Sequence, residues 1–154
     1  MGDLMRRLQS LFAATLLALA AVPAQAADIQ LMAMTELKAV QGGHFITAAD
    51  INGTSVRVLV DTGATAVALS YEDAHSVGLS PGNLDYDVPV STANGITKAA
   101  RVRLDRVVID GVEVEDVDGL VLPEGALAGT LLGMSFLSRL SSFRVEDGVL
   151  YLRN

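Results

Sequence analysis

Four dipeptides place most of the turns of this chain. Asn52-Gly53, Asn94-Gly95, Asp110-Gly111 and Asp147-Gly148 each lie between two runs of apolar residues. Asn or Asp followed by Gly supplies the positive φ angles that a two-residue hairpin turn needs. The flanking runs alternate with polar residues or form short blocks, which is the pattern of strands rather than of helices. The sequence therefore predicts a meandering, mainly antiparallel β domain.

Helical patterns are confined to two short segments. Ser70 is a suitable N-cap for a helix over residues 71–75, which Gly78 would end. Helical spacing of apolar residues predicts a second helix over 134–140. Residues 28–41 are less regular, and fit either an N-terminal strand or a loosely held arm.

The first 26 residues have the pattern of a secretory signal. Arg6 and Arg7 precede an apolar stretch over residues 11–22, which is followed by Pro23-Ala24-Gln25-Ala26. We expect cleavage after Ala26, and an uncleaved N-terminal anchor is the alternative. Both predict export to the periplasm, and the second would leave the protein anchored in the inner membrane. The expected organisation is a signal peptide or anchor over 1–26, an N-terminal arm over 27–42 and one domain over 43–154.

Composition excludes several kinds of chemistry. The chain of 154 residues has room for one domain, and it contains no cysteine, so disulfides, thiolate metal sites and cysteine nucleophiles are excluded. Its formal charge of −7 argues against a nucleic-acid partner, because such binding depends on neutralising phosphates. Carboxylates, hydroxyls and two histidines are left as reactive groups.

One acidic residue interrupts the apolar run over 58–69. Asp61 follows the apolar residues 58–60 and precedes Thr62, Gly63 and a stretch of small and apolar residues. This context predicts a carboxylate buried near the core, which is costly unless hydrogen bonds or a function compensate for it. Gly63 can direct backbone amides toward that carboxylate, and Thr62 adds a hydroxyl. Asp61 is therefore the first candidate for a reactive residue.

Three segments in this order resemble the retropepsin-like aspartic proteases. Asp61-Thr62-Gly63-Ala64 resembles the active-site loop of that family, and the run from Val90 to Gly95 resembles its flap hairpin. Leu131-Leu132-Gly133 resembles the apolar-apolar-Gly signature that precedes a short C-terminal helix. The resemblance covers residues 43–153, and within the family the sequence resembles a bacterial exported subgroup.

The resemblance implies an all-β fold, namely a closed or partly open β-barrel with a flap hairpin and one or two short helices. It implies that Asp61 is catalytic and that neither a cofactor nor a metal is needed. The other implied site residues are Thr62, Gly63 and Ala64 in the active-site loop, Ser91, Thr92, Ala93, Asn94 and Gly95 in the substrate-binding flap, and Leu131, Leu132 and Gly133 as support for the loop.

Aspartic protease chemistry requires two carboxylates that share one proton, but this chain contains a single Asp-Thr-Gly. A two-fold symmetric homodimer would supply the second Asp61. In this family the C-terminal strand often contributes to dimerisation, which implies residues 149–152 here. We expect an endopeptidase that hydrolyses peptide or protein substrates with water activated between two Asp61 carboxylates. The alternative is a dimeric retropepsin-like binding or assembly module with weak or no catalysis.

Other motifs are better explained as structure. Residues 78–82 match Gly-x-Ser-x-Gly, but Pro81 has no N–H for an oxyanion hole and no apolar strand precedes the serine. The acidic run over 113–119 lacks the spacing of a calcium loop and fits a strand with Val112, Val114 and Val117 turned inward. His44 and His75 are too far apart in sequence to indicate a zinc site.

Overall fold

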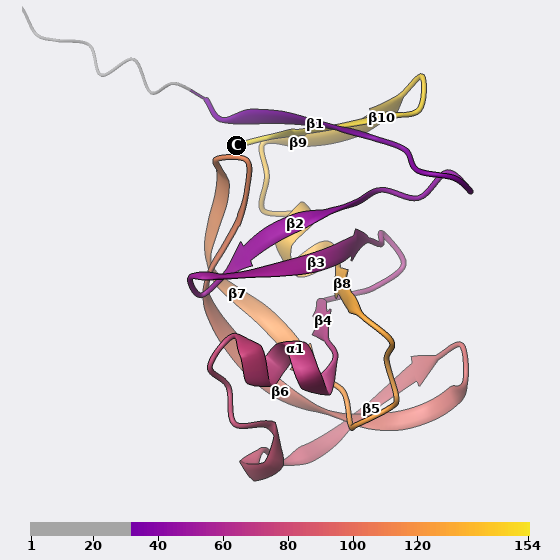
Figure 1. Ribbon diagram of the computed structural model, residues 1–154, viewed down its shortest axis with the longest axis vertical. Helices are drawn as coiled ribbons and strands as arrows, with labels where there is room; N and C mark the ends of the chain where they lie inside the picture. Colours follow the sequence, from indigo (N-terminus) through magenta and orange to yellow (C-terminus); the bar gives the residue numbers. More distant parts are fainter. Residues whose placement is uncertain (1–31) are drawn as a thin grey trace, which may run out of the picture. The chain divides into compact units, whose positions relative to one another are not determined.

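The computed structural model describes residues 32–154, so the predicted signal over 1–26 lies outside the described residues. The described part is built almost entirely of strands, with three short helical segments (Figure 1). No helix within residues 32–154 has the length and hydrophobicity needed to cross a membrane. The elements are β1 (Met34–Lys38), β2 (Ile46–Ile51), β3 (Thr54–Val60), β4 (Val67–Leu69), α1 (Tyr71–Ser76), the 3₁₀ helix η1 (Pro81–Asn83), β5 (Tyr86–Thr92), β6 (Gly95–Ile109), β7 (Val112–Val121), β8 (Thr130–Leu132), α2 (Met134–Leu137), β9 (Ser142–Glu146) and β10 (Val149–Arg153).

Six strands close into a barrel. The hydrogen-bonded order is β2-β3-β8-β4-β7-β6, and β6 returns to β2 through the pairs Asp50↔Val108 and Ile51↔Val107. The predicted antiparallel meander describes most of these pairings, but β3–β8 and β4–β7 are parallel. The barrel interior is filled by side chains that are almost fully buried, including Ile51, Val58, Leu69, Leu104, Val107, Ile109, Leu132 and Phe136.

Three of the four predicted turns lie where the sequence places them. Asn52, Asp110 and Asp147 have φ angles of 52°, 45° and 48°, and the glycine after each also has a positive φ. These angles match hairpin turns whose twist suits the flanking strands. The predicted inward orientation of the β7 valines is also confirmed, since Val112, Val114 and Val117 are buried.

The fourth turn is shifted by one residue. Ala93 and Asn94 form the loop, whereas Gly95 is the first residue of β6 and pairs with Thr92. The Thr92 side chain explains the shift, because its hydroxyl accepts from the Asn94 N–H (3.2 Å) and donates to the Gly95 carbonyl (2.9 Å). A threonine hydroxyl can organise a turn in this way.

Both predicted helices exist, and the second is shorter than expected. The Ser70 hydroxyl caps α1 by accepting from the Asp73 N–H (3.1 Å). Instead of extending over 134–140, α2 ends at Leu137, and the next residues form tighter i→i+3 turns such as Arg139 N–H to Phe136 O. Leu140 is nevertheless buried, as its helical spacing predicted.

A separate three-stranded antiparallel sheet has the order β1-β10-β9. The open question about residues 28–41 is resolved in part, because residues 34–38 form a strand. The Thr35 hydroxyl also donates to Asp110 Oδ2 (3.0 Å) in the β6–β7 turn, which ties β1 to the barrel. Because β10 pairs with β1 on one side and with β9 on the other, the backbone of residues 149–152 has no free edge within residues 32–154. Whether these residues contribute to dimerisation stays a prediction.

Candidate active site

The loop after β3 folds around Asp61. The Asp61 N–H donates to Leu132 O (3.1 Å), which continues the β3–β8 ladder by one residue. The Gly63 N–H donates to Asp61 Oδ1 (2.8 Å), as the small-residue turn predicted. Asp61 is half-buried, and Thr62 and Gly63 are exposed, so the expectation of a carboxylate buried near the core is wrong for the single chain. The physical reason is that the chain leaves the barrel at Val60, and the loop lies at the surface.

The rest of the loop packs directly against the backbone of Gly133. A Cβ placed there would come 2.1 Å from the Ala66 carbonyl oxygen and 2.7 Å from that of Ala64. The Met134 N–H donates to Ala64 O (2.8 Å), which fixes the loop against the start of α2. A glycine is therefore required by close backbone approach.

Ser135 fastens the far end of the loop. Its hydroxyl accepts from the Val67 N–H (2.9 Å) and donates to Asp118 O (2.6 Å) on β7. The loop is thus held at Asp61, Ala64 and Val67, and rigid support of this kind is what a reactive side chain needs.

A cavity of about 640 Å³ separates this loop from the β5–β6 hairpin. Figure 1 shows the loop after β3 and the tip of the hairpin on the same side of the molecule. Of the predicted site residues, the cavity brings together Asp61, Gly63, Ala64, Ser91, Thr92, Ala93 and Leu131, and its lining does not include Thr62, Asn94, Gly95, Leu132 or Gly133.

Among residues 32–154, Asp61 is the one ionisable side chain that lines this cavity. The remaining lining is small, hydroxylic or apolar, and part of it comes from Ala68 and Leu122, which belong to a small hydrophobic cluster. Within residues 32–154, no three His, Cys, Asp or Glu side chains lie together as a metal site requires. The cavity of the single chain therefore offers one carboxylate opposite a largely apolar lining.

Several lining residues were missed by the sequence analysis. They come from the loop and β4, from β5, from the end of β7 and from the segment that leads into β8. For Leu120, Leu122 and Leu127, the one signal in the sequence was their apolar character. The missed residues are Thr65, Ala66, Ala68, Pro89, Leu120, Leu122 and Leu127, whereas Val90 begins the run that resembles the flap.

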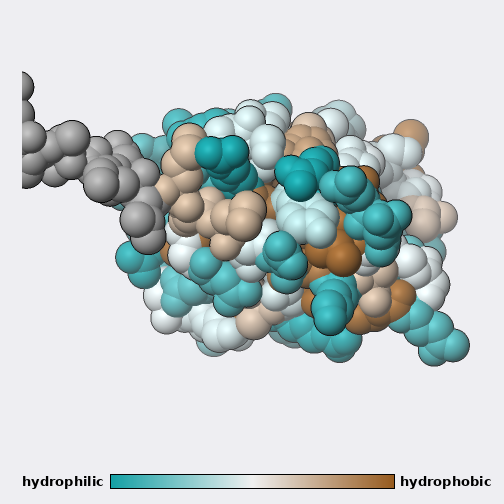
Figure 2. Space-filling view, turned by 90° about the horizontal axis from the view of Figure 1, so that it is seen from above, coloured by the Kyte–Doolittle hydropathy of each residue, from teal (hydrophilic) through white to brown (hydrophobic). Residues whose placement is uncertain are grey.

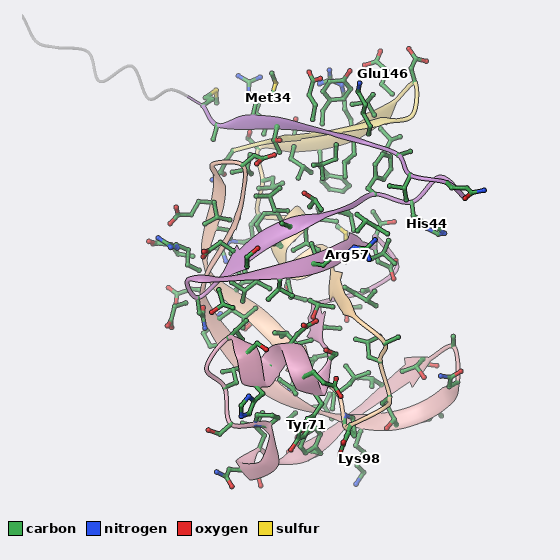
Figure 3. The ribbon with its side chains drawn as sticks, in the orientation of Figure 1. Met34, His44, Arg57, Tyr71, Lys98 and Glu146 are labelled. Atoms are coloured by element: carbon green, nitrogen blue, oxygen red, sulfur yellow. The ribbon has the colours of Figure 1, made fainter. Side chains whose placement is uncertain are left out.

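Thr62 borders a second hollow of about 280 Å³. This hollow lies between the Asp61 loop and β9, and Phe143, Arg144 and Val145 line it together with Asp61. His44, on the loop before β2, also lines it and is exposed (Figure 3).

Tyr86 stands at the base of the β5–β6 hairpin. Burial raises the pKa of its phenol above the usual value, and the neighbouring Tyr71 adds to this increase. The Tyr86 hydroxyl donates to Pro81 O (3.1 Å), which ties the start of the hairpin to η1. The neutral phenol is therefore the form that anchors the hairpin.

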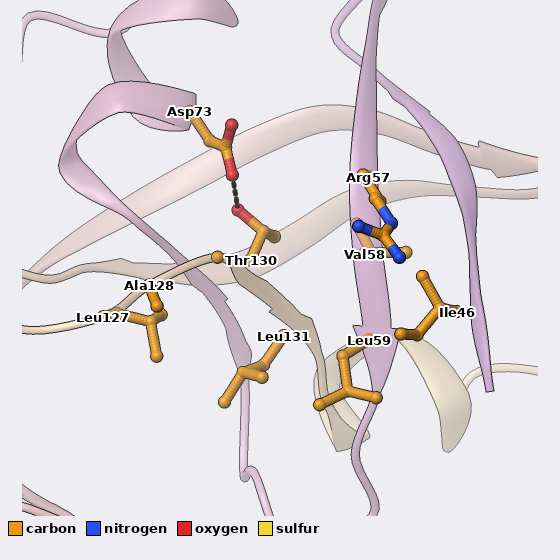
Figure 4. Close-up of a pocket in the computed structure, with 10 residues that line it drawn as sticks. Ile46, Arg57, Val58, Leu59, Asp73, Leu127, Ala128, Thr130 and Leu131 are labelled. Atoms are coloured by element: carbon orange, nitrogen blue, oxygen red, sulfur yellow. Dashed lines mark hydrogen bonds between the residues drawn. The ribbon is translucent and has the colours of Figure 1, made fainter. Parts of the chain in front are cut away.

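A third hollow, of about 480 Å³, lies beside β3 and β8 and contains a partly buried side-chain hydrogen bond (Figure 4). The Thr130 hydroxyl donates to Asp73 Oδ2 (2.7 Å), and Thr130 is only 1% exposed. This bond joins α1 to the strand that leads directly into Leu131-Leu132-Gly133. The bond therefore helps to fix β8, the strand that pairs with β3 just before the Asp61 loop.

Replacing Thr130 by valine keeps the shape of the side chain and removes this hydrogen bond. We expect the free energy of unfolding to fall by about 1–2 kcal/mol, because a hydrogen bond to a carboxylate is lost. Urea unfolding would measure the change. The matched control is Thr47→Val, since the Thr47 hydroxyl makes only a long bond (3.4 Å) to the adjacent carbonyl. Equal stability of the two variants would contradict this role of Thr130.

Comparisons with known proteins identify the family of the chain. Residues 47–139, more than half of the chain, match the family model described as gag-polyprotein putative aspartyl protease. The structure is similar to a retropepsin-like aspartic protease from Rickettsia conorii, with a TM-score of 0.72 and 36% identity over 79% of this chain and 91% of the other. EIAV protease in complex with the inhibitor HBY-793 shares the fold, with a TM-score of 0.53 and 22% identity over 67% of this chain and 93% of the other.

Two curated relatives carry no functional name. An uncharacterized protein in the cobV 5′ region of Sinorhizobium sp is 42% identical over 77% of this chain and 51% of its own length. The uncharacterized protein RP867 of Rickettsia prowazekii is 42% identical over 71% of this chain and 47% of its own length. This chain thus spans about half the length of the curated relatives it matches. The family match over the barrel and the likeness to a retropepsin-like structure lead to one conclusion: the chain belongs to the retropepsin-like aspartic protease family.

Proposed function

We propose that this protein is an exported aspartic endopeptidase that works as a homodimer, with one Asp61 from each copy. The observation that carries this proposal is the cavity between the Asp61 loop and the β5–β6 hairpin, whose lining has a single carboxylate. Two acids are needed, one as the base toward water and one as the donor to the scissile carbonyl. The similarity to the retropepsin-like aspartic protease from Rickettsia conorii supports the same reaction class.

In the proposed reaction, an extended peptide lies between the Asp61 pair and the two hairpins. Ser91, Thr92 and Ala93 line the cavity, and β5 is the last strand of its sheet within residues 32–154, so we expect this hairpin to pair with the peptide as an added strand. Closure of the hairpins excludes water and strengthens the electrostatic interactions around the carboxylates. Export is proposed on the signal-like residues 1–26 alone.

The concentration dependence of cleavage tests this proposal. Below the dissociation constant of the dimer, doubling the protein concentration should raise the cleavage rate of a denatured protein substrate about fourfold, because the active species forms from two copies. Sedimentation of the same samples would report the dimer fraction. A specific activity that stays constant in samples that sediment as monomers would contradict the shared site. Dimers that bind substrate without cleaving it would instead favour a binding or assembly module.

A further inference from the structure

The hollow beside β3 and β8 combines an apolar lining with two charged side chains. Its apolar residues include Ile46, Leu59 and Leu131, and Arg57 and Asp73 also line it. In the view from above, by contrast, hydrophilic and hydrophobic residues are interspersed over the surface (Figure 2). An apolar depression with a few polar groups is the usual form of a binding site, because the polar groups fix the orientation of the ligand. The hollow therefore points to a ligand group with an apolar stem and a charged end.

The two charged side chains of the hollow are not equally available to a ligand. Asp73 is half-buried, and its Oδ2 already accepts a hydrogen bond from the Thr130 hydroxyl (2.7 Å). Arg57 is exposed, and it belongs to none of the ion pairs within residues 32–154. Figure 4 shows the side chains of Arg57 and Asp73 on opposite sides of the hollow. The Arg57 guanidinium is therefore the group left for a ligand, and a carboxylate matches its planar, two-pronged geometry.

This hollow adjoins the cavity that contains Asp61. Leu127 and Leu131 line both of them, whereas of the two Asp61 lines only the cavity and Arg57 lines only the hollow. The order outward from Asp61 is therefore the cavity, the two shared leucines and then the hollow. A ligand that extends outward from the carboxylate passes over these leucines and reaches Arg57.

An extended peptide has the spacing needed to fill both depressions. Its side chains alternate, so residues two positions apart point to the same side and are about 7 Å apart. A peptide that places the residue at the cleaved bond in the cavity therefore directs the residue two positions farther out toward the hollow. Apart from Asp61, the lining of the cavity within residues 32–154 is uncharged and includes Leu120 and Leu122, which suits an apolar side chain at the cleaved bond.

Arg57 is at a suitable distance from Asp61 for this contact. It lies in β3, four residues before Asp61, which corresponds to about 13 Å of extended chain. The outward residue of the peptide lies about 7 Å beyond the residue at the cleaved bond, and the long side chains of arginine and glutamate bridge the remaining distance. Leu59 is on the same face of β3 as Arg57 and lines the hollow, so the apolar lining continues toward Asp61.

We infer that Arg57 determines specificity by binding an acidic side chain of the substrate, two positions outward from an apolar residue at the cleaved bond. This inference rests on the proposed function, because the peptide runs through the cavities of both copies. In a symmetric dimer each copy supplies one cavity and one hollow, so the same preference applies on both sides of the cleaved bond. The preferred sequence is therefore acidic-x-apolar before the bond and apolar-x-acidic after it.

A profile of cleavage sites tests this preference. A mixture of reduced, denatured serum albumin and casein is digested, and the products are sequenced by mass spectrometry. The wild type should cut most often where Asp or Glu lies two positions outward from the apolar residue. Arg57→Gln should lose this enrichment, and Arg57→Glu should replace it by an enrichment of Lys or Arg. The matched control is Arg106→Gln, which changes the net charge equally at an exposed position of β6 outside both depressions, and its profile should equal that of the wild type.

Two synthetic peptides measure the size of the effect. One contains Glu-Ala-Leu-Leu-Ala-Glu, and the other has Gln in place of both Glu residues. The wild type should cleave the Glu peptide with a kcat/KM about tenfold higher, because each of two ion pairs near the surface contributes about threefold. Salt should reduce this difference, since it screens exposed charges. Arg57→Gln should cleave the two peptides equally, while Arg106→Gln should keep the difference.

Binding of the same peptides, with a fluorescent label, to the Asp61→Asn protein measures the preference without cleavage. Fluorescence anisotropy should give a Kd about tenfold lower for the Glu peptide, and the added Arg57→Gln substitution should abolish the difference. Equal binding of the two peptides, or enrichment of Lys or Arg in the wild-type profile, would overturn the role of Arg57. Failure of the proposed function would look different, with preferential binding of the Glu peptide but no cleavage that depends on Asp61.

Discussion

The Asp61→Asn protein is expected to lose at least about 10³-fold in cleavage rate while it keeps its fold and the dimerisation proposed above. Asparagine cannot take up the proton of the attacking water, and general acid–base catalysis of this kind contributes about 10²–10⁴-fold. The amide oxygen can still accept from the Gly63 N–H, which donates to Asp61 Oδ1 in the native loop. The loop geometry should therefore survive, so the loss would report on chemistry rather than on folding.

The control for this experiment is Asp105→Asn, which removes one exposed carboxylate on β6. Its cleavage rate should match that of the wild type. Mixing an excess of the Asp61→Asn protein with wild type should also inhibit cleavage, because mixed dimers contain one carboxylate instead of two. Cleavage by purified Asp61→Asn at the wild-type rate would rule out the proposed reaction.

Gly133→Ala is expected to be the most damaging substitution outside Asp61. The added Cβ would lie 2.1 Å from the Ala66 carbonyl oxygen, and the obstacle is backbone, which cannot rotate away. Overpacking a core costs about 1–3 kcal/mol. We expect the upper end of that range, together with loss of cleavage, because the loop that carries Asp61 must be displaced.

Gly129→Ala is the matched control. Nothing lies within 4 Å of the Cβ it would add, and Gly129 has no positive φ angle to strain. Urea unfolding of the two variants should therefore separate a steric effect from the general loss of a glycine. If Gly133→Ala proved as stable and as active as Gly129→Ala, the close approach of the two backbones would not be needed.

Local features of the sequence predicted local structure well. The turns at Asn52, Asp110 and Asp147 require only two residues with suitable backbone preferences, and each is present. The cap at Ser70 is equally local. The turn at Asn94 was misplaced by one residue because the Thr92 hydroxyl, two residues earlier, competes with the preference of the dipeptide.

Pairings between distant segments could not be predicted from these patterns. β8 has three residues and lies between β3 and β4, and its parallel partner in β3 is some 70 residues earlier in the chain. No periodicity indicates such a neighbour. The resemblance to a family pointed to Asp61, the hairpin and Gly133 together, whereas the apolar wall from Leu120, Leu122 and Leu127 required the coordinates. The exposure of Asp61 was misjudged because an apolar run does not reveal where the chain leaves the barrel.

Because β6 is long, its two ends have different strand neighbours. From Ala100 to Ile109 it pairs with β7 as part of the barrel wall, while from Gly95 to Ala99 its only strand neighbour within the described residues is β5. The pairing with β7 ends at Ala100. Ala99 and Ala100 are both buried, and their small side chains give the backbone little packing support at this point. The β5–β6 hairpin is thus attached to the barrel at one end only. Bending should therefore concentrate where the hairpin leaves the barrel rather than at its tip. Access to Asp61 would then be governed by the elasticity of a strand, without a hinge loop.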